Sequence, residues 1–322
     1  MKAIRHAAFG APDEVLVCET LDDPPPPGPG EIALEMLFAP INPADLLRAE
    51  NRYGETPELP AIPGFEGVGR VAAVGEGVDG VAVGALACPL AASTWRQRIT
   101  CPAKRAMILP PDVDLHQAAM IKANPATAWA MLQVADLKPG ERLIQNAANS
   151  AVGRLVARFA GARGIETVNL VRREESAALF EGVPHATALV CDPADADAVR
   201  RAGPAQAAFD AVGGAASEAL TGALDESGLL LVYGLLSGAP SRIGPIDLVF
   251  RDIRVQGFWL KRWAEAAEPA TLKGLYGELI GLLQAGALDT PVERVYPMDE
   301  IAAAAAHAAR PGRSGKILLD LR

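Results

Sequence analysis

Residues 142–173 read RLIQNAANSAVGRLVARFAGARGIETVNLVRR, and this stretch decides the fold. Residues 142–146 predict a short buried strand, Ala151 to Ala162 predict a helix, and Ile165 to Val171 predict a second strand. Gly164 separates the helix from the strand that follows it. A strand, helix and strand in this order are typical of a parallel sheet, so the stretch predicts a doubly wound α/β domain.

The turn before the predicted helix is a candidate anion site. Backbone N–H groups at a helix N-terminus and the helix dipole favour a group such as a pyrophosphate. Compared with the G-x-G-x-x-G fingerprint of dinucleotide-binding domains, the turn has Ala148 and Ser150 at the first two positions and keeps only Gly153. An ordinary crossover between parallel strands needs equally small residues, so the spacing alone leaves both interpretations open.

Two arginines follow the second strand. Arg172 and Arg173 occupy the place where an NAD enzyme usually has a carboxylate that binds the ribose 2′-hydroxyl. Guanidinium groups suit a 2′-phosphate instead. The pair therefore predicts NADPH as the cofactor, and the alternative is that both side chains belong to a solvated strand end.

Composition sets the broad class. At 322 residues with 50% hydrophobic side chains, the chain suits two domains with ordinary cores. The net charge of −9 argues against nucleic acid or an anionic membrane as a partner. No apolar run reaches the roughly 20 residues of a membrane span, and the start lacks the apolar core of a signal peptide, so a cytoplasmic location is expected. The cysteines lie far apart and contain no C-x-x-C pair, which predicts free thiols rather than a zinc lobe.

Strands and turns dominate the first third of the chain. The alternating pattern from Glu31 to Pro40 and the glycines and valines from Gly67 to Val83 predict strands joined by tight turns, as in a small β-barrel. Tyr53 lies on a loop of this region, where it could have a chemical role or only pack with its hydroxyl satisfied. The sequence thus predicts a barrel domain at 1–118 plus 262–322, with a cofactor domain at 119–261 inserted into it.

Together these motifs resemble the medium-chain dehydrogenase/reductases over essentially the whole chain. The resemblance is carried by Asn42-Pro43-Ala44-Asp45, Tyr53-Gly54, Gly64-Phe65-Glu66-Gly67, Gly84 and the turn from Asn146 to Gly153. It implies a GroES-like barrel joined to a Rossmann domain. In the zinc alcohol dehydrogenases of that superfamily, a cysteine ligand would lie near Asn42 and a histidine ligand near Phe65. Since both are missing here, the chain resembles the zinc-free branch, and no metal is expected.

Within that branch the chain is most similar to the 2-enoyl thioester reductases. The matching segments are Tyr53-Gly54, Thr94-Trp95-Arg96, Asn124-Pro125-Ala126-Thr127-Ala128, the residues 144–153 and Gly257-Phe258-Trp259-Leu260. The resemblance implies NADPH-dependent reduction of the C2=C3 bond of an enoyl-CoA or enoyl-acyl-carrier-protein. One departure concerns the cofactor phosphate: relatives carry a second arginine where this chain has Glu174, so Arg173 would have to substitute.

The resemblance also assigns roles to individual residues. Tyr53 is the expected proton donor or enolate partner. Trp95, Phe258 and Trp259 are expected to line the substrate pocket, with core packing as the alternative for Trp259. The expected cofactor-binding residues are Asn42, Asn124, Thr127, Asn149, Ser150, Ala151, Val152, Gly153, Arg172, Arg173, Tyr233, Gly234, Phe258 and Lys316.

Other functions stay open at this stage. Zinc-free quinone reductases resemble the chain as well, so reduction of quinones or free enones is one alternative. A cofactor-binding structural or regulatory protein without turnover is another, because fold does not fix function. A homodimer is the expected assembly.

Overall fold

The computed structural model describes every residue from Met1 to Arg322. The chain divides into two compact units, one formed by Met1–Ala123 together with Lys273–Arg322 and the other by Asn124–Leu272. The second division falls inside a long helix, α11 (Pro269–Gln284). None of the helices combines the length and the apolar character that crossing a membrane requires.

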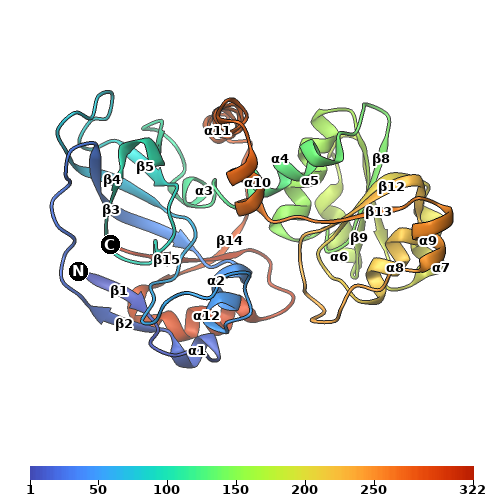
Figure 1. Ribbon diagram of the computed structural model, residues 1–322, viewed down its shortest axis with the longest axis horizontal. Helices are drawn as coiled ribbons and strands as arrows, with labels where there is room; N and C mark the ends of the chain where they lie inside the picture. The colour runs from blue at the N-terminus through green and yellow to red at the C-terminus, as the bar shows by residue number, and fades with distance from the viewer. The chain divides into compact units, whose positions relative to one another are not determined.

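A six-stranded parallel sheet forms the centre of the second unit, drawn in green to orange in Figure 1. The strand order is β10-β9-β8-β11-β12-β13. The strands are β8 (Arg142–Gln145), β9 (Glu166–Val171), β10 (Ala186–Val190), β11 (Ala205–Asp210), β12 (Leu224–Val232) and β13 (Arg254–Gly257). The helices are α4 (Asn124–Ala135), α5 (Ala151–Ala162), α6 (Glu174–Ala177), α7 (Ala196–Ala202), α8 (Ala215–Gly222), α9 (Pro245–Phe250) and α10 (Leu260–Ala266). The predicted doubly wound α/β fold is confirmed.

The strand order fixes where this sheet can bind a ligand. From β8 the chain moves outward through β9 and β10, then returns to the other side of β8 for β11. Such a reversal leaves the carboxyl ends of the two neighbouring strands open, and ligands of doubly wound sheets bind there. Apolar side chains of the strands and of α8, among them Ile144, Ala208 and Leu220, fill the core beneath.

A seven-stranded sheet forms the centre of the first unit. Its longest strand, β3 (Glu31–Pro40), pairs along one edge with β4 (Val68–Val74). Along its other edge β3 pairs with β6 (Arg98–Pro102) and then with β15 (Lys316–Asp320). The remaining strands are β5 (Leu86–Pro89), β7 (Ala106–Leu109) and β14 (Val292–Pro297), with β1 (Lys2–Arg5) and β2 (Val17–Thr20) in a separate pair. The helices are α1 (Pro12–Val15), α2 (Pro43–Ala49), α3 (Leu115–Ala119) and α12 (Ile301–Ala309), together with the part of α11 that belongs to this unit.

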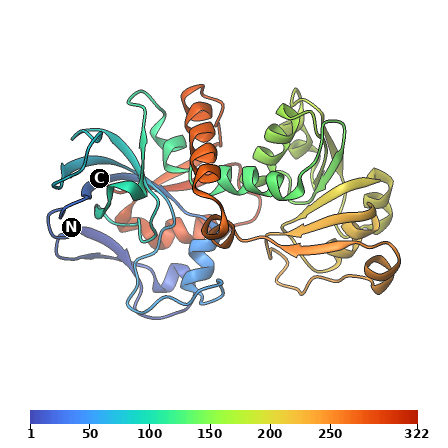
Figure 2. The same ribbon diagram turned by 45° about the horizontal axis from the view of Figure 1, so that its top comes forward.

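Both ends of the chain contribute to the core of the first unit. The blue N-terminal and red C-terminal segments lie side by side in Figures 1 and 2, where α12 packs against α1. Ile4, Ile41, Trp95, Ile317 and Leu319 belong to the same buried cluster and are almost entirely inaccessible to solvent. Burial of such side chains contributes roughly 1.5–3 kcal/mol each, so the C-terminal strand is an integral part of this unit.

Candidate functional site

The turn between β8 and α5 forms a close cradle at a helix N-terminus. Ser150 caps α5, and its hydroxyl accepts a hydrogen bond from the Gly153 N–H at 3.1 Å. A Cβ at Gly153 would lie 2.5 Å from the Ala148 carbonyl oxygen, so only glycine allows the helix to come this close to the turn. Asn149 is exposed at the tip of the turn, and Ala151 and Val152 are half-buried in the first turn of the helix.

Tyr233 faces the same cradle from the end of β12. Its hydroxyl is enclosed beside Ser150 and completes no hydrogen bond with a protein group in the geometry present. Burial raises the pKa of this phenol, so Tyr233 stays protonated and keeps a donor to offer. An enclosed donor without an acceptor is costly unless a ligand supplies one. The cradle therefore fits an anionic group such as a pyrophosphate.

The two arginines after β9 have different surroundings. Arg172 is exposed and forms no ion pair. Arg173 stands at the N-cap position of α6, and its Nε lies 3.2 Å from a carboxylate oxygen of Glu175. Of the two guanidinium groups, Arg172 is thus the one available to a phosphate at this strand end, which fits NADPH. The binding role of both arginines remains a prediction.

A buried polar network holds the neighbouring strand ends together, and sequence reasoning missed it. Asn146 donates from Nδ2 to Asp210 Oδ1 at 2.7 Å and accepts from the Ala211 N–H at 2.8 Å. Asp210 also accepts from the Ser217 hydroxyl at 2.5 Å and from the N–H groups of the Gly-rich turn. The network fixes the ends of β8 and β11 at the place where the sheet order reverses. The available signal was a polar residue at the carboxyl end of each strand, Asn146 directly after β8 and Asp210 as the last residue of β11.

The other predicted site residues of the second unit lie in three places. Asn124 and Thr127 stand in the first turn of α4, and the Asn124 amide nitrogen is buried without a partner. A Cβ at Gly234 would lie 2.6 Å from the Ala211 carbonyl oxygen, so the ends of β12 and β11 approach closely. Phe258 continues β13 by donating its N–H to the Val232 carbonyl at 2.8 Å.

Trp259 is half-buried and lies directly after Phe258. The Lys261 ammonium lies 5.7 Å and the Arg262 guanidinium 5.6 Å from the Trp259 ring centroid. Cations at this distance are attracted to the face of the indole. The assignment of Phe258 and Trp259 to a substrate pocket stays a prediction.

In the first unit, Tyr53 lies on the loop that follows α2. Its ring is half-buried and packs on Phe65, with the two ring centroids 5.2 Å apart and the planes tilted by 50°. A phenol in this setting is held by its ring while its hydroxyl can serve as a donor. Its catalytic role remains a prediction.

Trp95 requires a correction, because its predicted place in a substrate pocket does not agree with its position. The side chain is 0% exposed within the core of the first unit, and the indole N–H donates to the Pro40 carbonyl at 3.3 Å. A ring enclosed on all sides by its own core cannot line a pocket. The sequence motif around Trp95 therefore reflects packing.

Asn42 and Lys316 meet in a buried cluster of charged and polar groups. The Lys316 ammonium donates to Asn42 Oδ1, and Asn42 Nδ2 donates to a carboxylate oxygen of Glu66 at 2.8 Å. Asp45 accepts from the Asn42 N–H at 2.8 Å through one oxygen, while its other oxygen is buried without a partner. Both Asn42 and Lys316 are thus engaged within the first unit, and their contact with a cofactor stays a prediction.

Burial dominates the ionisation of this cluster. It raises the pKa of Asp45 to about 7, although the Asn42 N–H opposes the shift. It lowers the pKa of Lys316 to about 8 against the attraction of Glu66 and Asp45. Desolvation disfavours every buried charge, and only the neighbouring opposite charges limit that effect. The protonation state of Asp45, Glu66 or Lys316 therefore depends on the charge of the other two.

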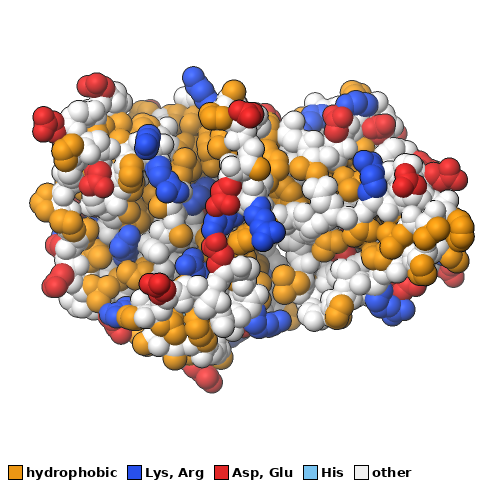
Figure 3. Space-filling view, in the orientation of Figure 1, with side chains coloured by type: hydrophobic (Ala, Val, Ile, Leu, Met, Phe, Trp, Pro, Cys, Tyr) orange, Lys and Arg blue, Asp and Glu red, His pale blue; other side chains and the backbone are white.

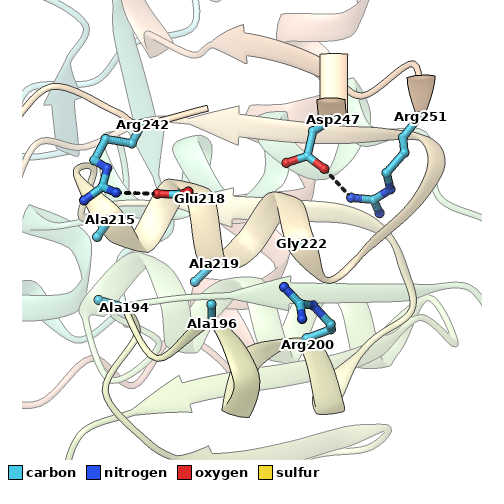
Figure 4. A pocket seen from close by; sticks show the side chains of 10 residues that line it. All are labelled: Ala194, Ala196, Arg200, Ala215, Glu218, Ala219, Gly222, Arg242, Asp247 and Arg251. Atoms are coloured by element: carbon cyan, nitrogen blue, oxygen red, sulfur yellow. Dashed lines mark hydrogen bonds and ion pairs between the residues drawn. The ribbon is translucent and has the colours of Figure 1, made fainter. Parts of the chain in front are cut away.

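A separate hollow of about 650 Å³ lies on the second unit among α7, α8 and α9 (Figure 4). Arg242 and Glu218 form an ion pair of 2.9 Å across it, and Arg251 and Asp247 form another of 2.6 Å. The third arginine of the lining, Arg200, lies 3.6 Å from a carboxylate oxygen of Asp197, so each arginine of the hollow already faces a carboxylate of the protein. We assign it no binding role.

Comparisons with known proteins place this geometry in a family. A model of the alcohol dehydrogenase GroES-like domain matches residues 28–107, and a model of zinc-binding dehydrogenases matches residues 184–319. The bovine protein named mitochondrial enoyl-[acyl-carrier-protein] reductase is 31% identical over 100% of this chain and 89% of its own length. The human protein of that name is 32% identical with the same coverage. This chain belongs to the enoyl-[acyl-carrier-protein] reductase family.

Solved structures agree with this membership of the medium-chain dehydrogenase/reductases. A putative NADPH:quinone reductase from Bacillus thuringiensis superimposes with a TM-score of 0.91, at 27% identity over 99% of this chain and 98% of that one. An enoyl thioester reductase from Candida tropicalis superimposes with a TM-score of 0.85 over 99% of both chains, and at 23% identity it supports the fold alone. The predicted resemblance to enoyl thioester reductases, with quinone reductases as further relatives, is confirmed.

This member of the enoyl reductase family differs from zinc dehydrogenases where their ligands would stand. Asn42 binds Lys316 and Glu66, and Phe65 offers only a ring. No three His, Cys, Asp or Glu side chains lie together in an arrangement that could hold a metal ion.

Removal of metal is therefore expected to have no effect. Dialysis of the purified protein against a chelator should leave both turnover and melting temperature unchanged, because no ligand set contributes metal-binding energy to the fold. Metal content and activity are measured before and after dialysis. Stoichiometric zinc that is lost together with activity would contradict the prediction.

Proposed function

We propose that this chain reduces the C2=C3 double bond of 2-enoyl thioesters, either enoyl-CoA or enoyl-acyl-carrier-protein, with NADPH. The observation that carries the proposal is the identity of about 31% with enoyl-[acyl-carrier-protein] reductases over the full length of this chain. The cradle at α5 and the unpaired Arg172 support NADPH as the cofactor. A solved relative of similar fold carries NADPH:quinone reductase as its name.

The proposed chemistry needs few groups from the protein. When bound, NADPH supplies a hydride for C3 of the enoyl group. Negative charge then develops on the thioester oxygen, and C2 receives a proton. We assign Tyr53 to donate from its hydroxyl, either to that oxygen or as the source of the proton. Phe258 and Trp259 would orient the acyl group, since correct positioning accounts for much of such a rate enhancement.

The proposed cofactor contacts follow the residues that the sequence predicts. We propose that Ser150, Tyr233 and the N–H groups at the start of α5 bind the pyrophosphate, and that Arg172 binds the 2′-phosphate. Asn124 and Thr127 would bind the nicotinamide or its ribose through their side chains. The remaining predicted contacts are Asn42, Asn149, Ala151, Val152, Gly153, Arg173, Gly234, Phe258 and Lys316.

Quinone reduction is the second candidate, and the Bacillus thuringiensis relative favours it. A steady-state panel separates the candidates: crotonyl-CoA, a longer enoyl-CoA and a quinone, each with NADPH and with NADH. We expect the highest kcat/KM with an enoyl-CoA and NADPH. A preference for the quinone would support the second candidate, and cofactor binding without turnover of any substrate would support a non-catalytic role.

We also propose a homodimer joined through the free edge of the sheet of the second unit. Figure 3 shows hydrophobic side chains gathered over β13 and α9. Val255 on β13 is 42% exposed, and Val249 and Phe250 on α9 are 68% and 78% exposed. An unpaired edge strand beside an apolar patch favours pairing with a second chain. A solved relative is described as a heterodimer of two enoyl thioester reductases.

Val255→Lys is expected to convert the dimer into a monomer, because an ammonium group on the edge opposes strand pairing. Light scattering after size exclusion measures the mass of the 33.6 kDa chain and its variant. Val83→Lys is the matched control, since Val83 is 66% exposed in the other unit. A monomeric wild type, or a variant that stays dimeric, would contradict the proposed interface.

We also propose a cellular compartment for this chain, the cytoplasm. The sequence-based expectation is the cytoplasm, whereas the curated relatives carry mitochondrial in their names. Fractionation of the source cells, followed by detection of the protein, tests this expectation.

A further inference from the structure

We infer that Phe65 is a positioning residue for Tyr53, and the inference rests on the proposed function. The Phe65 ring contacts two other groups, with the Tyr53 ring centroid at 5.2 Å and the Arg48 guanidinium at 5.5 Å. Phe65 stands where a zinc dehydrogenase would have a ligand. Its contacts indicate that the ring has a function of its own.

The main chain on both sides of Phe65 is held by buried groups. The Lys122 ammonium donates to the Phe65 carbonyl oxygen at 2.6 Å. The Thr94 N–H donates to the Gly64 carbonyl at 3.2 Å, and the Thr94 hydroxyl donates to the Glu66 carbonyl at 2.7 Å. Three consecutive peptide units are therefore fixed by hydrogen bonds, so the base of the Phe65 side chain has little freedom.

Close packing adds to this restraint. Gly64 has a φ of +101°, and a Cβ there would lie 2.8 Å from the Trp95 nitrogen. The Glu66 carboxylate is 0% exposed and accepts from Asn42 at 2.8 Å and from the Ala123 N–H at 2.7 Å. Hydrogen bonds to a charged group are stronger than those between neutral groups. The loop that carries Phe65 is thus anchored in the core of the first unit.

Tyr53 lies on a long connection with little regular structure between α2 and β4. The main chain is bonded at Arg52, whose N–H donates to the Leu47 carbonyl at 2.8 Å, and again at Ala61, which pairs with His6. Between these points the half-buried ring of Tyr53 contacts the anchored Phe65. Aromatic rings at this separation attract each other beyond the effect of burial, which favours one orientation of the phenol.

Arg48 is the second group that restrains Phe65. Arg48 lies on α2, its Nε is buried without a hydrogen-bond partner, and its guanidinium group packs on the Phe65 ring. A guanidinium group over an aromatic ring is attracted to the face of that ring. The order Arg48, Phe65, Tyr53 therefore transmits the rigidity of α2 and of the buried cluster to the loop that carries the proposed proton donor.

Phe65→Leu tests the inference in two backgrounds, wild type and Tyr53→Phe. Displacement of a reacting group by about 1 Å can cost 10²-fold in rate, so we expect Phe65→Leu to lower kcat for crotonyl-CoA by about 10- to 100-fold in the wild type. In the Tyr53→Phe background, where no phenol remains to be positioned, the same change should alter kcat less than about twofold. KM for NADPH should not change in either background.

Two controls separate positioning from general damage. Phe9→Leu is the matched substitution: Phe9 is half-buried in the same unit and packs on His6 at 5.9 Å, and we expect full activity. Phe65→Tyr keeps the ring and should retain at least half of the wild-type kcat. It also provides a test if Phe65→Leu melts below the assay temperature.

The outcomes distinguish this inference from the proposed function. If Tyr53→Phe is slow and Phe65→Leu slows both backgrounds by the same factor, Phe65 does not act through Tyr53 and the inference alone fails. A Phe65→Tyr variant as slow as Phe65→Leu would overturn it as well. If Tyr53→Phe retains full activity, the proposed role of Tyr53 fails, and the inference fails with it.

Discussion

Tyr53→Phe is expected to lower kcat for crotonyl-CoA reduction by 10²- to 10³-fold, the usual effect of removing a donor that stabilises developing negative charge. The substitution keeps the ring that packs on Phe65, so the loop and its surroundings should stay in place. KM should change little, because the hydroxyl interaction is stronger in the transition state than in the ground state. The measurement is steady-state kinetics with NADPH in excess.

Two further measurements make this result interpretable. NADPH affinity and melting temperature of Tyr53→Phe should equal those of the wild type, since the hydroxyl is assigned to the chemical step alone. Residual turnover is expected, because solvent can still protonate C2. A variant with unchanged kcat would reduce Tyr53 to a packing residue and leave solvent as the first candidate for the proton donor.

Arg172→Ala is expected to weaken NADPH binding by tenfold or more while NADH binding barely changes. A charge-assisted hydrogen bond to a phosphate is worth roughly 1.5–3 kcal/mol, and only NADPH carries the 2′-phosphate. Titration of both cofactors, followed by the fluorescence of the bound nicotinamide, gives the two dissociation constants. Equal weakening of both would show that Arg172 does not contact the 2′-phosphate.

Arg173→Ala is the matched comparison. Its guanidinium already pairs with Glu175 at 3.2 Å, so part of its charge is neutralised within the protein. We therefore expect a smaller loss of NADPH affinity than for Arg172→Ala. If Arg173→Ala had the larger effect, the ion pair with Glu175 would have to open when the cofactor binds.

Local patterns predict the second unit well, because its elements follow one another in space as they do in sequence. The strand from Arg142, the helix Ala151–Ala162 and the strand ending at Val171 all appear where the apolar periodicity places them. Gly153 is also where a close approach requires it. The network around Asp210 was not predicted. Its partner Asn146 is 64 residues away in the sequence, and its partner Ser217 lies in the helix that follows the strand.

Local sequence patterns predict the elements of the first unit less well. The glycines and valines of residues 67–83 suggest several strands, yet only Val68–Val74 forms one, because the remaining residues find no neighbouring strand to pair with. Trp95 carries a motif typical of the family and still lies in the core. The meeting of Lys316 with Asn42 depends on contacts across almost the entire chain, which no local pattern encodes.

The contact between β15 and β3 also bears on the order in which the protein can mature during its synthesis. A ribosome releases the whole of Asn124–Leu272 before it has translated Lys316, so the second unit can fold while the first still lacks its last strand. Until then, part of the β3 edge lacks its neighbouring strand, and Asn42 Oδ1 and the Glu66 carboxylate lack the Lys316 ammonium. The N-terminal region is therefore translated first but completed last, and a nascent chain halted before Lys316 would expose an unfinished core to aggregation or to proteolysis.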